Sequence, residues 1–131
     1  MMKILVGYKG VNVGQDLLEI ADFHARAFDA EVLVATSMKG GANLDQSEVY
    51  AAEENLKHTK KFFENKKISC ETHLLVRGME PGEDIVNFAR EQGVDEIIIG
   101  VKSRSKVGKL IFGSTAQAVI LQAHCPVVTV K

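Results

Sequence analysis

Hydrophobic residues along the chain form short aliphatic runs separated by longer stretches in which polar residues are mixed in. The runs cover residues 3–8, 31–37, 69–78, 94–100 and 125–130. The first two are typical of strands buried on both faces, whereas residues 69–78 begin with alternation and end aliphatic, as a strand at the edge of a sheet would. The stretches between them predict helices over residues 13–28, 47–65, 81–92 and 114–124. Strict alternation of strand and helix predicts a doubly wound α/β fold around a parallel sheet, with five strands and four helices.

The predicted helices carry signals for the faces that they bury and for their ends. Residues expected to face the core are Leu17, Ile20, Ala21, His24, Ala25 and Phe28 in the first helix, and Leu56, Phe62 and Phe63 in the second. In the third helix, Pro81 suits the first turn and Gly93 the carboxyl cap. Glu80, Glu83 and Asp84 lie near the amino terminus of that helix, where the dipole favours acids.

Length and charge limit the classes of protein to consider. With 131 residues, of which 46% are hydrophobic and 25% charged, residues 1–131 fit one globular domain. The formal charge of -1 gives no overall basic field, so we expect neither nucleic acid nor a membrane surface as partner. No apolar run approaches the roughly 20 residues of a membrane span. Cys70 and Cys125 match no CxxC pattern, which favours a reducing cytoplasm.

The segment "GVKSRSKVGKLIFGST", residues 100–115, is the best candidate for binding a phosphate. Gly100 ends a predicted strand and allows a sharp turn, and Gly113, Ser114 and Thr115 lie where a helix begins, with free amides and hydroxyls. Basic residues lie between them, at positions 102, 104, 106 and 109. Spacing alone leaves a second interpretation open, in which Ser114 or Thr115 is a plain N-cap beside a solvated basic loop.

Other kinds of site find little support. The segment lacks the first glycine and the final Ser or Thr of a Walker loop, and "GYKGVNVG" is not the dinucleotide pattern GxGxxG. The four histidines lie in different elements with no metal-ligand spacing, so we expect no metal site. Ser114 has no GxSxG surroundings, and no carboxylate is paired with a nucleophile. The sequence therefore predicts no catalytic residues and no efficient enzyme.

The chain resembles the universal stress protein family over essentially its whole length. Nucleotide-binding members carry G-x2-G-x9-G-[ST] after the fourth strand, then a helix and a last strand often written CPV. Here Gly100, Ser103 and the pair Gly113-Ser114 have that spacing, with serine replacing the second glycine, and "HCPVVTVK" follows. The resemblance implies the strand order 3-2-1-4-5. It also implies a bound adenine nucleotide, ATP or another, with which Mg²⁺ could bind.

Site residues carried over from the family lie on two sides of one cleft. The adenine side comprises Gly7, Tyr8, Lys9 and Ser37. The phosphate side comprises Gly100, Val101, Ser103, Arg104, Lys109, Gly113, Ser114 and Thr115. ATP-binding members usually have an acid at the end of the first strand, as in VDGS, and this chain has Lys9 there.

Three hypotheses for the function follow. The first is a cytoplasmic regulatory module that binds an adenine nucleotide without efficient turnover. The second, favoured by Lys9 and Ser103, is an interaction protein of the same fold that binds no nucleotide and acts through its homodimer surface. A slow nucleotide hydrolase ranks last, because no base that could activate water is evident.

A homodimer is expected through the last strand under either of the first two hypotheses. "PVVTV" is apolar and lies at the edge of the sheet, where unpaired backbone groups can pair with a second chain. Pro126 must start the strand, which leaves Val127, Val128, Thr129 and Val130 for the pairing.

Overall fold

The computed structural model describes residues 1–101 and 112–131. Within these residues, one sheet contains five parallel strands in the order β3-β2-β1-β4-β5, as the resemblance implied. The strands are β1 (Lys3–Lys9), β2 (Glu31–Met38), β3 (Cys70–Val76), β4 (Glu96–Gly100) and β5 (Val127–Val130). The helices are α1 (Gln15–Phe28), α2 (Gln46–Asn65), α3 (Pro81–Gln92) and α4 (Ser114–Gln122). The predicted α/β fold is confirmed, with element ends shifted by one or two residues.

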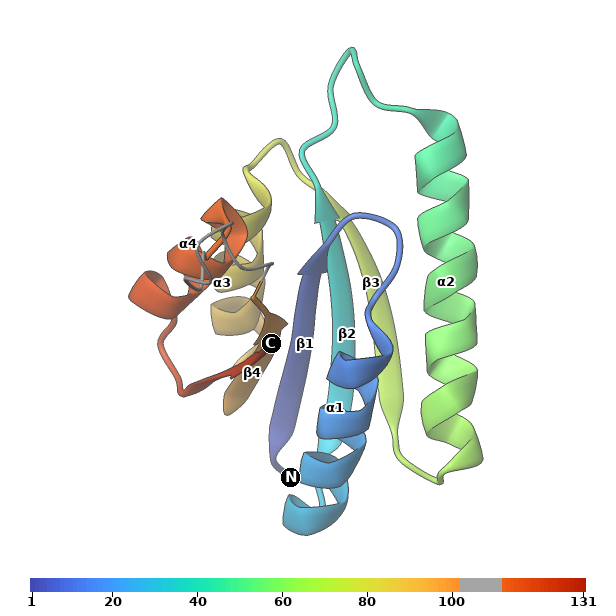
Figure 1. The fold of residues 1–131 in the computed structure, drawn as a ribbon, viewed down its shortest axis with the longest axis vertical. Helices are drawn as coiled ribbons and strands as arrows, with labels where there is room; N and C mark the ends of the chain where they lie inside the picture. Colours follow the sequence, from blue (N-terminus) through green and yellow to red (C-terminus); the bar gives the residue numbers. More distant parts are fainter. Residues whose placement is uncertain (102–111) are drawn as a thin grey trace, which may run out of the picture.

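Helices cover both faces of the sheet, α1 and α2 on one face and α3 and α4 on the other (Figure 1). Because successive strand residues point to opposite faces, Ile4 and Val6 pack under α1 and α2, whereas Leu5 packs under α3 and α4. Each strand of the central part therefore contributes to two separate cores. This explains why the central strands β1 and β4 are largely aliphatic, whereas β3, at the edge of the sheet, has polar residues among its apolar ones.

The buried face of α1 differs from the prediction at Phe28, the residue at the carboxyl end of the helix. Leu17, Leu18, Ala21 and Ala25 are buried, but Phe28 is 51% exposed. Phe28 is the last residue of α1, and the chain leaves the helix through Asp29 in a left-handed conformation (φ 52°). The ring of Phe28 lies edge-on to His24, which pairs with the buried carboxylate of Glu96 at 2.6 Å.

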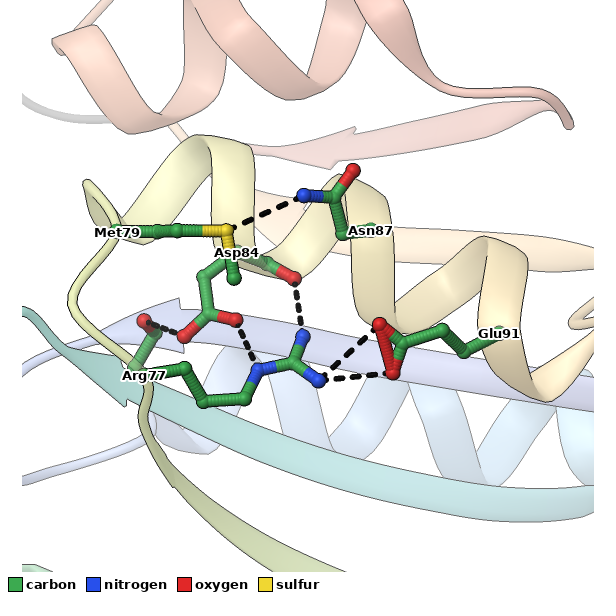
Figure 2. Close-up of polar contacts among 6 residues, drawn as sticks. Arg77, Met79, Asp84, Asn87 and Glu91 are labelled. Carbon is green, nitrogen blue, oxygen red and sulfur yellow. Dashed lines mark hydrogen bonds and ion pairs between the residues drawn. The ribbon is translucent and has the colours of Figure 1, made fainter.

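A buried carboxylate fixes the first turn of α3 against the sheet. Asp84 is fully buried and accepts a hydrogen bond from the Ser37 hydroxyl on β2, at 2.7 Å, and one from Arg77 Nε, at 2.6 Å. Arg77 follows β3 and also pairs with Glu91, two turns further along α3 (Figure 2). A buried charge is tolerated only when it is paired and hydrogen-bonded, and these partners meet that need. The sequence predicts for Asp84 only a favourable interaction with the helix dipole. In the structure, its carboxylate also holds α3 to Ser37 of β2 and to Arg77.

Candidate binding cavity at the carboxyl edge of the sheet

A cavity of about 380 Å³ opens at the carboxyl edge of the sheet, beyond the ends of β1 and β4. The strand order reverses between these two strands, and this is where doubly wound sheets bind ligands. The residues that line this carboxyl-edge cavity are Gly7, Tyr8, Lys9, Asn12, Gly14, Asp16, Leu17, Ile99, Gly100, Val101, Gly113, Ser114, Thr115, Ala116, Val130 and Lys131.

The amino terminus of α4 forms one side of the cavity. The helix begins at Ser114, and the N-cap position is taken by Gly113, in an extended conformation (φ −67°, ψ 165°). Neither Ser114 nor Thr115 is therefore the N-cap, and the basic loop of that second interpretation lies outside the described residues. Because glycine has no side chain to cap the first amides, and because no acid lies in the first turn, the positive end of the helix dipole remains available to an anion.

The amino terminus of α1 faces the same cavity with the opposite electrostatic character. Gly14 is its N-cap, again with no capping side chain, but Asp16 lies in the first turn. A carboxylate at this position offsets the positive end of the helix dipole. Of the two helix ends at the cavity, α4 is therefore the better site for a phosphate, and α1 presents a hydrogen-bond acceptor.

The end of β1 forms the floor of the cavity. At Gly7, a Cβ would lie 2.9 Å from Cγ2 of Ile85, so glycine allows α3 to pack closely. Tyr8 also lines the cavity. Its hydroxyl donates to Oδ1 of Asn55 in α2 at 3.4 Å, on the face of the sheet that α1 and α2 cover. Burial raises the pKa of Tyr8 well above its usual range, so the hydroxyl stays a neutral donor. Lys9 is exposed.

Gly100 and Val101 line the cavity at the end of β4. The φ angle of Gly100 lies outside the left-handed region, and a Cβ there would make only ordinary contacts, the nearest with Leu17 at 3.8 Å. A sharp turn therefore does not require glycine at position 100, contrary to the prediction. Its absence of a side chain leaves open space in the cavity instead.

The structure brings together most of the predicted site residues that it describes. Gly7, Tyr8, Lys9, Gly100, Val101, Gly113, Ser114 and Thr115 all line the cavity. Ser37 does not, because its side chain is 1% exposed and its hydroxyl is bonded to Asp84. Ser103, Arg104 and Lys109 lie outside the described residues.

Several lining residues were missed from the sequence. Asp16 could have been found as an acid in the first turn of a helix that starts at this edge. Val130 and Lys131 follow from the pairing of β5 beside β4, which brings the end of β5 next to Gly100. Asn12 lies in the β1–α1 loop, and no local pattern marked it.

The described residues offer little for catalysis or for metal binding. Across residues 1–101 and 112–131, no group of three His, Cys, Asp or Glu side chains could hold a metal ion. Among the lining residues that the structure describes, only Asp16 has a side-chain carboxylate, and none is histidine or cysteine. None of the helices described here is both long enough and apolar enough to cross a membrane.

Comparison with known proteins identifies the family. The family model described as "Universal stress protein family" matches residues 1–131. The chain belongs to the universal stress protein family. A universal stress protein of Methanocaldococcus jannaschii is 33% identical over 141 aligned positions, which cover 98% of this chain and 81% of that protein. One from Mycolicibacterium smegmatis is 28% identical, with 98% of this chain and 96% of that protein covered.

Solved universal stress proteins have the same fold. A structure from Archaeoglobus fulgidus superimposes with a TM-score of 0.89 at 37% identity and covers 100% of this chain and 99% of its own. A second Archaeoglobus fulgidus structure, in complex with dAMP, has a TM-score of 0.83 at 33% identity, with 100% and 98% covered. Both likenesses extend over the whole alternating framework that holds the cavity.

In this universal stress protein, Gly82 of α3 sets the position of the first turn of α4. A Cβ at Gly82 would lie 2.6 Å from Cβ of Ala118 and 3.1 Å from the carbonyl oxygen of Thr115. Neither atom belongs to the flexible end of a side chain, so α4 would have to move. The close approach of α3 and α4 at this glycine therefore holds the amino terminus of α4 over the cavity.

We expect Gly82→Ala to destabilise the protein by about 1–3 kcal/mol, the usual cost of overpacking a well-packed contact. Gly14→Ala is the matched control, because no heavy atom lies within 4 Å of a Cβ there and φ is −69°. Its cost should stay below about 1 kcal/mol, the loss of a favoured N-cap residue. Urea denaturation measures both, and equal stability of Gly82→Ala and wild type would show that α3 and α4 are not in close contact.

Proposed function

We propose that this universal stress protein is a cytoplasmic regulatory module that binds an adenine nucleotide in the carboxyl-edge cavity. The observation that carries the proposal is the glycine-capped amino terminus of α4, open to the cavity at Gly113 and Ser114. Backbone amides at such a helix end bind phosphate, and the dipole favours the charge. The related Archaeoglobus fulgidus protein in complex with dAMP supports an adenine nucleotide as the ligand class.

The nucleotide is placed with its phosphates at α4 and its nucleoside toward the ends of β1 and α1. Two features favour this orientation, namely the absence of acids in the first turn of α4 and the carboxylate of Asp16 at α1. Asp16 accepts hydrogen bonds from sugar hydroxyls in this arrangement, whereas it would repel a phosphate. ATP or another adenine nucleotide fits this pattern. Mg²⁺, where present, would be held mainly by the phosphates themselves, as is usual for this ion.

The chemistry of the lining residues supports binding without efficient turnover. Hydrolysis needs a base that orients and activates water. Asp16 is the single side-chain carboxylate among the described lining residues, and it lies at the end of the cavity proposed for the nucleoside. The alternative function is an interaction protein that binds no nucleotide, and Lys9 at the end of β1 is the observation that favours it.

We expect Gly113→Val to abolish nucleotide binding and to leave the fold intact. The extended conformation of Gly113 (φ −67°, ψ 165°) is open to valine, so the backbone is not strained. The branched side chain would cover the amides at the start of α4 and keep a phosphate away. Ser114→Ala is the matched control, since it removes a hydroxyl but keeps the amide, and should weaken binding only a few-fold.

Calorimetric titration with AMP and with ATP plus magnesium measures these affinities, and circular dichroism confirms that each variant is folded. Wild-type affinity in folded Gly113→Val would contradict the placement of the phosphates at α4. No binding by the wild type at millimolar nucleotide, on the order of the weakest affinity that marks a site, would favour the interaction protein.

We propose a homodimer through β5, which lies at one edge of the sheet. The carbonyls of Pro126 and Val130 accept from Ile97 and Val101 on the β4 side, at 3.0 and 2.8 Å. Since the backbone groups of a parallel strand alternate in direction, the N–H and C=O of Thr129 point away from β4. These groups are available to a second copy, in which the same strand pairs antiparallel across a twofold axis.

Thr129→Pro should convert the dimer into a monomer. Proline removes the outward N–H and leaves the bonds to β4 intact, and prolines are tolerated in edge strands. Thr129→Ala keeps the N–H and should remain dimeric. Sedimentation equilibrium at tens of micromolar protein, on the order of usual assay concentrations, measures the mass, and a monomeric wild type would refute pairing through β5.

A further inference from the structure

The β1–α1 loop, residues 10–14, forms a wall of the carboxyl-edge cavity through Asn12 and Gly14. Val13 of this loop is buried in the core, and the buried polar groups of the loop backbone also need hydrogen-bond partners. In this protein two such partners come from elements that lie behind the loop, outside the cavity. They are the side chains of Asn55, in α2, and Thr36, in β2.

Asn55 bonds the loop and the strand before it through a single atom. The Val13 amide donates to Oδ1 of Asn55 at 3.2 Å, and the Tyr8 hydroxyl donates to the same oxygen at 3.4 Å. Val13 and Tyr8 are both buried, each 7% exposed. A buried amide that loses its acceptor costs free energy, so the Val13 amide needs the acceptor at Asn55.

Thr36 holds the other end of the loop. Its hydroxyl donates to the carbonyl of Gly10 at 2.6 Å, and its side chain is fully buried. Gly10 has φ +101°, a conformation that favours glycine. The bond from Thr36 is therefore made at the residue where the chain changes direction after β1. The loop is therefore anchored at both ends by side chains from α2 and β2.

Neither anchoring side chain lines the cavity. The residues by which α2 packs on the rest of the molecule are Ala52, Leu56, Thr59 and Phe63, which are buried on one face of the helix. Asn55 is half-buried beside that face and directed to the loop. The two groups that bond its side chain belong to Val13 and Tyr8, which pack in the core under α1 and α2, and Tyr8 also lines the cavity.

We propose that Asn55 is a positioning residue for nucleotide binding, which holds the β1–α1 loop in the shape that keeps the carboxyl-edge cavity open, with Thr36 as the second anchor. This inference rests on the proposed function. Without the acceptor at Asn55 the loop samples other shapes, and the ligand then selects the competent one at a cost in affinity. Loss of the 3.2 Å bond from Val13 and of the longer 3.4 Å contact from Tyr8 corresponds to roughly a tenfold loss of affinity.

Three variants distinguish a role of Asn55 in holding the β1–α1 loop from a role in stabilising α2 itself. Asn55→Leu removes the acceptor and keeps a similar volume. Asn55→Asp keeps an oxygen that can accept from both Val13 and Tyr8. Thr59→Val is the control, because the Thr59 hydroxyl bonds only the carbonyl of Asn55 within α2, at 2.9 Å, and makes no bond to the loop.

Calorimetric titration with AMP measures affinity, and hydrogen exchange of the Val13 amide by NMR measures loop opening without any ligand. We expect Asn55→Leu to bind AMP about tenfold more weakly and to exchange Val13 faster, while Asn55→Asp and Thr59→Val stay near wild type. Wild-type affinity in folded Asn55→Leu would overturn the proposal, as would equal weakening by Thr59→Val.

The two readouts also distinguish failure of the inference from failure of the proposed function. If the wild type binds AMP but Val13 exchanges equally fast with and without the Asn55 acceptor, the anchoring role is wrong and the binding function stands. If the wild type binds no nucleotide, the proposed function fails, and the positioning role fails with it. In that case slow exchange at Val13 that depends on Asn55 would still show the anchored loop.

Discussion

The parallel pairing of β1 with both β2 and β4 is the constraint on which the rest of the structure depends. Because the strand order reverses at this point, α1 and α4 leave the sheet on opposite faces, and both begin at its carboxyl edge. Glycine caps both helices there, Gly14 and Gly113, so neither amino terminus is closed by a side chain. The cavity is the space between these two helix ends. Because Asp16 lies in the first turn of α1 and no acid lies in the first turn of α4, the α1 side is the more negative and the α4 side the more positive.

Contacts from both faces of the sheet hold this cavity in place. On one face, Asp84 of α3 is hydrogen-bonded to Ser37 of β2, which fixes α3 on the sheet. The close approach at Gly82 then fixes α4 relative to α3. On the other face, Asn55 of α2 and Thr36 of β2 hold the loop that precedes α1. Most of the energy of such a fold comes from burial of aliphatic side chains, but these few polar contacts decide where the binding groups lie.

Local patterns predicted the fold and part of the site. Aliphatic runs and helical spacing are local signals, and they placed every strand and helix to within two residues. The lining residues at the start of α4, such as Ser114, follow from the same elements, whereas Lys9 came from the family resemblance. The bonds that Ser37 and Asn55 make could not be predicted in this way, because their partners Asp84 and Tyr8 are each 47 residues distant in sequence. Such pairings depend on how helices pack across the sheet, which no local pattern records.

We propose that an adenine nucleotide binds with its phosphate at the amino terminus of α4. An NMR titration of the ¹⁵N-labelled protein with AMP tests it most directly, since it reports each amide separately. We expect saturable shifts at the amides of Ser114, Thr115 and Ala116, which start α4 and line the cavity. Saturable shifts confined to another surface, such as the charged face of α2, or none at millimolar AMP, would contradict it.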